Sequence, residues 1–175
     1  MRMRFLATVL LAIGVAGCSA ANTEAVPVAG YVLAPDAPSL VDISHLASAD
    51  LVRGLSREDC GPILMTSLVS LHDLKRSSGL GRIVSEMVAT GVTARGYSVV
   101  EARLTKALTI SSAGEHILSS EVRELARAQK ATAVIAGTYG ILGDRAYVTV
   151  RLIRLSDGVI ISSSDFDLPL VWQGS

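Results

Sequence analysis

The chain has 175 residues, and its 16 basic side chains (Lys and Arg) balance 16 acidic ones (Asp and Glu). A chain without a basic excess lacks the electrostatic footprint of a nucleic-acid-binding domain, so we expect no nucleic-acid partner. Half of the residues are hydrophobic, but only two Phe and one Trp occur. The length and composition predict one domain whose core is built from Val, Ile, Leu and Ala.

The N-terminal stretch has the composition of a targeting segment. Arg2 and Arg4 precede an apolar run of 12 residues, from Phe5 to Ala16. A helix needs about 20 apolar residues to span a bilayer, so this run is too short to do so. It predicts a signal peptide over residues 1–17 that is removed from the mature protein.

Small residues lie directly before Cys18, in the order Val-Ala-Gly-Cys. This order resembles the bacterial lipobox, with Val where Leu is commoner. The resemblance implies cleavage after Gly17 and diacylation of the Cys18 thiol, with the new amino group open to a further acyl chain. Two or three chains, at about 0.8 kcal/mol per buried CH₂, hold a protein on a membrane more firmly than one. The alternative is a secreted protein in which Cys18 carries no lipid.

Ser19 follows the cysteine. In the sorting pattern of two-membrane bacteria that this order resembles, Ser at this position sends a lipoprotein to the outer membrane. We therefore expect a protein held at the outer membrane by its lipid, with the domain on the periplasmic side.

Residues 18–38 contain three Pro and no helical periodicity, which predicts a lipid-anchored linker. A domain over residues 39–175 follows. Ser39 has the features of an N-cap and Asp42 lies in the first turn, so a helix is expected from Leu40 to about Leu55.

The body of the domain alternates strands and helices. Apolar runs predict strands over 63–69 and 97–102, and helical spacing predicts a helix over 80–95 that ends at Gly96. A second helix ends near Lys130; three serines are alternatives for its N-cap: Ser112, Ser119 and Ser120. Two successive β-α-β steps imply right-handed crossovers and parallel strands.

The last third reads as three strands, TAVIAGTY, RAYVTVRLIRL and VIISSSDF, which begin at Thr132. Gly143-Asp144 and Asp157-Gly158 between them are hairpin signals, because Gly adopts the positive φ that such turns need. The first of these strands is continuously apolar, which is typical of a central strand buried on both faces.

The middle strand alternates with a period of two, which predicts one packed and one open face. The packed face is expected to carry Ala146, Val148, Val150 and Leu152. The open face is expected to carry Arg145, Tyr147, Thr149 and Arg151, and we assign Tyr139 to the solvated surface as well. This surface is either an ordinary solvated sheet face or a contact face for another protein, formed by Tyr147, Thr149 and Arg151.

These elements predict an α/β (α+β) domain with a core over residues 62–168. We expect a small mixed sheet of about five strands in the order βαβαβββ, preceded by an N-terminal helix. The helices are expected mainly on one face of the sheet.

No catalytic constellation is visible, so we expect no enzymatic activity, no cofactor and no metal. The loop 77–82 lies before a helix, as phosphate loops do, but lacks the Lys-Ser/Thr of a P-loop and reads as a capped helix start. His45, His72 and His116 fall in different elements without ligand spacing.

Two further groups have more than one interpretation. Asp165 and Asp167 share a strand face, where they either bind a cation or discourage edge-to-edge aggregation. Once Cys18 carries lipid, Cys60 is alone; it is either a small buried residue or a partner in an intermolecular disulfide.

Several short motifs occur in a characteristic order: Leu80-Gly81-Arg82, Arg95-Gly96-Tyr97 with 99–104, Gly114-Glu115 with Leu118-Ser119, Ala136-Gly137-Thr138-Tyr139, and Val150-Arg151-Leu152 with Asp157-Gly158. This order and spacing, over residues 62–168, resembles the FlgO family of flagellar outer-membrane lipoproteins. The resemblance implies a non-enzymatic role at the base of a flagellum, in its assembly, stability or motility, with flagellar ring or other envelope proteins as partners.

The order of elements is also similar to that of curli secretion lipoproteins and of lipoprotein activators of peptidoglycan synthases. An alternative function is therefore an envelope lipoprotein that binds and regulates a cell-envelope enzyme or a secretion complex.

Replacement of the anchoring thiol tests the lipid anchor. We expect Cys18→Ser to move the protein from the membrane fraction to the soluble fraction, because the acyl chains have no other attachment site. Fractionation and immunoblotting measure the change. An unchanged membrane fraction would refute the anchor.

Overall fold

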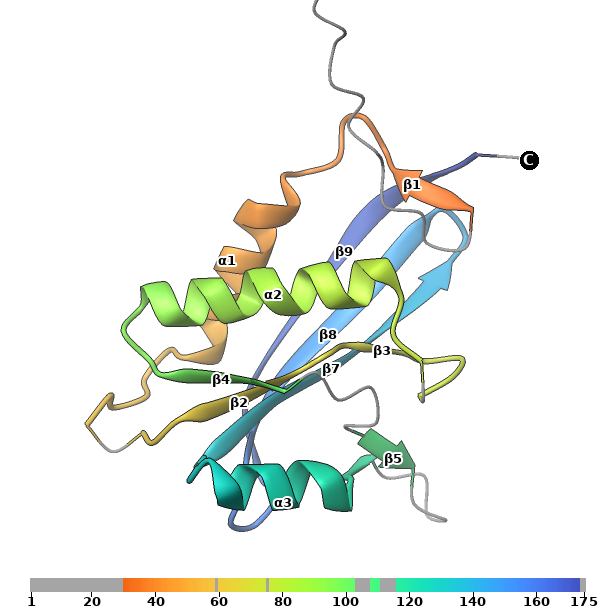
Figure 1. The fold of residues 1–175 in the computed structure, drawn as a ribbon. Coiled ribbons are helices and arrows are strands. Elements are labelled where there is room, and N and C mark those ends of the chain that lie inside the picture. Colours follow the sequence, from red (N-terminus) through yellow and green to blue (C-terminus); the bar gives the residue numbers. More distant parts are fainter. Residues whose placement is uncertain (1–29, 59, 75, 103–107, 111–115, 174–175) are drawn as a thin grey trace, which may run out of the picture.

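The computed structural model describes residues 30–58, 60–74, 76–102, 108–110 and 116–173 (Figure 1). In chain order the elements are β1 (Tyr31–Leu33), α1 (Leu40–Leu51), β2 (Ile63–Thr66), β3 (Val69–Ser70), α2 (Gly79–Ala94), β4 (Val99–Ala102), β5 (Leu108–Ile110), β6 (His116–Leu118), α3 (Ser120–Ala128), β7 (Ala133–Leu142), β8 (Arg145–Arg154) and β9 (Ile160–Trp172).

The main sheet has the strand order β1-β9-β8-β7-β2-β4, and β3 extends it beside β7. As predicted, β2 is parallel to both β4 and β7, whereas β7, β8 and β9 are antiparallel. Both predicted hairpins form, with Gly143 and Gly158 at φ 62° and 75°. The mixed α/β class is confirmed.

The sheet has seven strands rather than about five. One addition is β1, which lies in the segment expected as linker and pairs with the end of β9. The other is β3, because the predicted strand 63–69 is interrupted. The Leu68 amide donates to the Ser85 hydroxyl of α2 (2.9 Å) instead of to a neighbouring strand. A separate two-stranded sheet, β5 with β6, lies where the sequence suggested a connection.

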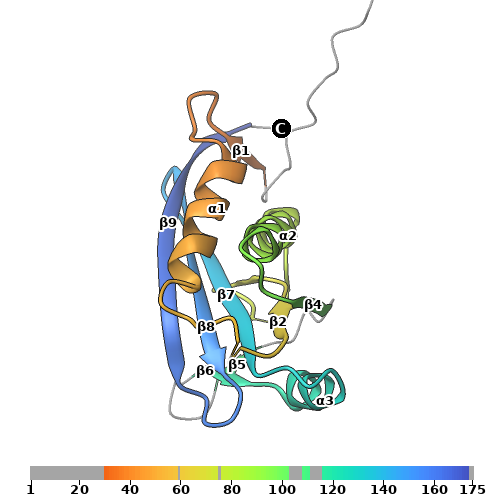
Figure 2. The same ribbon diagram turned by 90° about the vertical axis from the view of Figure 1, so that its left-hand side faces the viewer.

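Two of the three described helices, α1 and α2, share one face of the sheet, as expected, but the second crossover helix, α3, lies on the other face (Figure 2). α1 and α2 pack on one face, against residues such as Ile63, Met65 and Ile135. α3 packs on the other face, where Val122 and Ala126 meet the alternate residues of β2 and β7.

The strand order explains this arrangement. The chain passes from β2 outward to β4, and then back across β2 to β7. Two right-handed crossovers that run in opposite directions must place their helices on opposite faces. The sequence predicted right-handed crossovers but did not show that the second crossover runs in the opposite direction to the first.

Local signals set the helix starts. Ser39 and Ser119 accept hydrogen bonds from the amides three residues on, Asp42 (3.4 Å) and Val122 (3.3 Å). Ser119 is therefore the N-cap among the three alternatives for α3. α1 ends at Leu51, earlier than the predicted Leu55.

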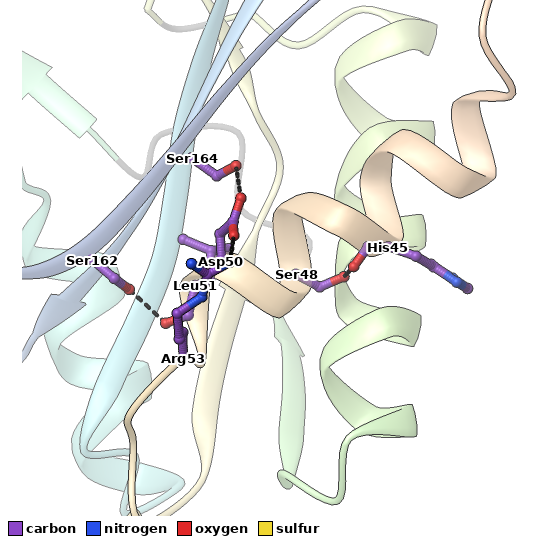
Figure 3. A network of polar contacts seen from close by, with 7 residues as sticks. All are labelled: His45, Ser48, Asp50, Leu51, Arg53, Ser162 and Ser164. Carbon is purple, nitrogen blue, oxygen red and sulfur yellow. Dashed lines mark hydrogen bonds and ion pairs between the residues drawn. The ribbon is translucent and has the colours of Figure 1, made fainter.

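α1 is tied to β9 by polar contacts (Figure 3). The Ser162 hydroxyl donates to the carbonyl oxygen of Leu51 (2.5 Å), and the Ser164 hydroxyl donates to the Asp50 carboxylate (3.2 Å). Asp50 also pairs with Arg53 (2.5 Å). The serines of β9 thus satisfy groups at the C-terminal end of α1 while their strand contributes to the core.

α1 also contacts α2 through small residues. A Cβ placed on Gly91 would lie 2.0 Å from the Ser48 hydroxyl and 2.9 Å from its Cβ. Ser48 is fully buried, and its hydroxyl donates to the carbonyl of Ser44 (2.7 Å). The two helices can approach this closely only because position 91 has no side chain.

Gly91→Ala tests this contact. Helix propensity alone would stabilise the variant by about 1 kcal/mol, but overpacking at a tight contact costs about 1–3 kcal/mol. We expect a net loss in the free energy of unfolding of about 1 kcal/mol, measured by urea denaturation. Thr90→Ala, on the exposed side of α2, is the control and should change stability by less than about 0.5 kcal/mol. A stabilised Gly91→Ala variant would contradict the tight crossing.

Candidate interaction surface

The register of β8 places its polar residues on the sheet face that α3 only partly covers. Thr149 lies between Thr138 of β7 and Asp165 of β9, and Arg151 lies beside Ser163 of β9. The intervening residues of β8 point to the opposite face, where α1 and α2 pack. The predicted two faces of the middle strand are therefore confirmed.

Burial shows where the cover by α3 ends. Near α3 the residues of this face are buried, including Ala136 and Thr138 of β7 and Ile153 of β8. Farther away they are not: Tyr147 is 47% exposed, and Leu142 and Asp165 are also exposed. We call this uncovered region the open face; its residues are Tyr147, Thr149, Arg151, Ile160, Ser163 and Asp165.

Charge on the open face is mixed. At its rim Arg145 forms an ion pair with Asp167 across the β8–β9 ladder. Arg151 is half-buried and, in the part of the chain that the structure describes, has no ion-pair partner. A guanidinium held by the sheet without a carboxylate partner retains its donors for an external group.

Tyr139 is not on the open face, contrary to the prediction. It pairs with Val148, so its side chain points to the packed face, where it is only 6% exposed. Its hydroxyl accepts a hydrogen bond from the Ser78 amide (3.0 Å). Antiparallel partners share a sheet face, and this pairing is what the sequence alone did not show.

The loop before α2 is a capped helix start, as the sequence indicated. Ser78 is the N-cap and accepts from the Gly81 amide (3.3 Å). A Cβ at Gly81 would lie 2.5 Å from the Leu68 carbonyl oxygen, so the loop is closely packed against the sheet. The amides of Ser78, Gly81 and Arg82 donate hydrogen bonds within the fold.

The other candidate groups are separated. His45 lies in α1, His72 follows β3 and His116 lies in β6. Within the described ranges, no group of three or more His, Cys, Asp or Glu side chains could hold a metal ion. Asp167 pairs with Arg145, whereas Asp165 is exposed.

Cys60 is a free, half-buried thiol packed at the margin of the core. Cys18 lies outside the described residues, so its modification stays a prediction. Among the helices that the structure describes, none is both long enough and apolar enough to cross a membrane.

One feature of this region was not predicted. Val159 and the first two residues of β9, Ile160 and Ile161, form an apolar run, which predicts burial, yet Ile160 is 53% exposed and the other two are exposed as well. A bulge lies at this point, since Leu152 pairs with Ser162 but Ile153 pairs with Ile160. Ile160 consequently lies beside Ile153 at one end of the open face. The sequence alone does not show this placement of Ile160, because it depends on the bulge in the β8–β9 pairing.

Comparison with known proteins gives two results. The chain has the same fold as the C-terminal domain of LpoB from Salmonella enterica, with a TM-score of 0.52 and 12% identity, over 75% of this chain and 99% of that domain. The solution structure of LpoB from Escherichia coli matches with a TM-score of 0.51 and 12% identity, over 93% and 84% of the two chains. No curated protein matches the chain in sequence.

The FlgO protein family matches residues 45–171, which include the C-terminal part of α1, the whole body and nearly all of β9. This range contains the open face and both sets of helices that frame the sheet. The chain therefore belongs to the FlgO family.

Proposed function

We propose that this chain is a non-enzymatic lipoprotein of the outer membrane that supports flagellar assembly, stability or motility through protein–protein contacts. Membership of the FlgO family supports the flagellar part of the proposal. The lipobox-like order before Cys18 supports the anchor, with the domain on the periplasmic side and flagellar ring or other envelope proteins as partners.

The observation that carries the proposal is the open face. A sheet face that carries an exposed Tyr147 and, beyond Thr149, a half-buried Arg151 with no ion-pair partner among the described residues presents the two side-chain types that are enriched at the centres of protein interfaces. The face lies on β8, the strand that pairs along its whole length with β7 and β9. Its side chains are therefore held in place before a partner binds, which lowers the entropic cost of association.

A second candidate uses the same face. In it, the chain is an envelope lipoprotein that binds and regulates a cell-envelope enzyme or a secretion complex. The observation behind it is the fold shared with LpoB, which shows that this fold occurs outside proteins named FlgO.

The free energy of unfolding of single variants distinguishes the open face of β8 from its packed face. Tyr147→Ala and Arg151→Ala should each change the free energy of unfolding by less than about 1 kcal/mol, because the truncated groups lie toward solvent. Leu152→Ala should cost about 2–5 kcal/mol, because Leu152 is fully buried. Urea denaturation measures all three. A large loss for Tyr147→Ala would assign it to the core instead.

Swimming and crosslinking experiments test whether the open face binds a partner. The double variant Tyr147→Ala/Arg151→Ala, expressed from the chromosome, should swim less than the wild type. Capture of flagellar basal-body proteins by crosslinking in envelopes, with the anchor intact, should fall at least about tenfold, because truncation of two interface anchors costs more than about 1 kcal/mol each.

The matched control is Leu46→Ala/Arg82→Ala, which removes an exposed apolar and an exposed basic side chain from α1 and α2. It should retain both swimming and capture. Normal swimming by a strain that lacks the gene would exclude the flagellar role. Capture of an envelope enzyme or secretion protein in place of basal-body proteins would establish the second candidate.

A further inference from the structure

A cleft of about 500 Å³ lies between α3 and the turn that joins β8 to β9. α3 and this turn are at the end of the sheet opposite β1 (Figures 1 and 2). We call this cleft the basic cleft and define it by Arg123, Arg127, Lys130, Leu155 and Asp157. It is distinct from the open face.

Positive charge is concentrated in this cleft although the chain has no net charge. Arg123, Arg127 and Lys130 follow i, i+4, i+7 spacing, and all three are exposed. Among the residues that the structure describes, none of them has an ion-pair partner. The acidic residues of the same helix, Glu121 and Glu124, do not line the cleft.

The carboxylate of the cleft is already engaged. Asp157 accepts hydrogen bonds from the Val159 amide (3.1 Å) and from the Arg154 guanidinium (2.7 Å). The amide, and to a lesser extent Arg154, hold the pKa of Asp157 below its ordinary value although partial desolvation opposes them. Asp157 therefore belongs to the turn and leaves the cations of α3 uncompensated.

Helix stability explains only part of this pattern. Cations near a helix C-terminus interact favourably with the helix dipole, which accounts for Arg127 and Lys130. Arg123 is the fourth residue of the nine-residue α3, beyond its first turn, so the dipole does not account for it.

Backbone hydrogen bonds hold the walls of the cleft. The Ala131 amide donates to the Ala126 carbonyl (2.8 Å), which closes the end of α3. The Leu155 amide donates to the Thr132 carbonyl (3.0 Å), which joins the turn to the start of β7. A ligand would enter a formed groove and would bear little cost for ordering it.

The geometry identifies the ligand. Arg123 and Arg127 are about 6 Å apart along the axis of α3 at 1.5 Å per residue, and Lys130, which lies two residues beyond the end of α3, lines the same cleft. Alternate residues of an extended peptide are about 6.6 Å apart. A single phosphate is best held by donors that converge on one point, whereas Arg123 and Arg127 are spaced along the helix and share the cleft with the apolar side chain of Leu155. We propose that the basic cleft binds an extended peptide segment of a partner protein that carries carboxylates at alternate positions.

Fluorescence anisotropy with a labelled (Glu-Val)₃ peptide tests the proposal, using the full chain with Cys18→Ser to remove the anchor. At low ionic strength the peptide should bind, and a matched (Gln-Val)₃ peptide should bind at least about tenfold more weakly. Arg123→Gln/Arg127→Gln should weaken the binding of the Glu peptide at least about fivefold. Gln retains the helix propensity of Arg, so α3 should remain folded.

The control Arg76→Gln/Arg82→Gln removes the same charge from exposed positions away from the cleft and should leave binding unchanged. Equal loss in both variants would mean an effect of net charge only and would overturn the proposal. Equal binding of the two peptides, or no binding, would overturn it too. Tighter binding to phosphatidylglycerol vesicles than to the peptide, with the same dependence on Arg123 and Arg127, would assign the cleft to a lipid surface instead. None of these outcomes depends on a flagellar role.

Discussion

Burial of one face of β8 is the constraint on which the rest of the structure depends. Val148, Val150 and Leu152 are almost completely inaccessible to solvent, and burial of each such side chain contributes about 1.5–3 kcal/mol. The sheet cannot bury this face by itself, so α1 and α2 must cover it together. Two helices fit over it because they meet at Gly91, where no side chain separates them. The polar contacts of Ser162 and Ser164 then place α1 on β9 rather than elsewhere.

The opposite face of the sheet is only partly covered. The reversal of chain direction between β4 and β7 sends α3 to this side, where it covers β2, β4 and β7. One short helix of nine residues cannot also cover β8 and β9. The open face is therefore a consequence of topology: the strand order brings a single helix to one half of a wide sheet. Tyr147 and Arg151 occupy the half that stays uncovered.

The same arrangement creates the basic cleft. The end of α3 approaches the β8–β9 turn because β7 begins directly after α3 and pairs with β8. The open face and the cleft thus share the outer side of the β7–β8–β9 ribbon, and a partner large enough to cover the face could reach both. β1, which lies within the predicted linker, is at the other end of the sheet (Figure 1). An anchored N-terminus would leave the cleft at the end of the domain that is farther from the entry of the chain.

The amino-acid sequence by itself determined the local features. Period-two alternation assigned the two faces of β8, glycines at positive φ marked both hairpins, and serine caps marked the starts of α1 and α2. These signals act over a few residues, so they can be recognised without knowing what packs against them. Only the tertiary structure decided which strands are neighbours. That neighbour relation moved Tyr139 into the core, sent α3 to the opposite face and exposed Ile160 at a bulge. The side that α3 takes depends on pairing among β2, β4 and β7, which are far apart in the chain, whereas the positions of Tyr139 and Ile160 depend on the exact register of the two hairpins. A periodic pattern within one segment specifies neither.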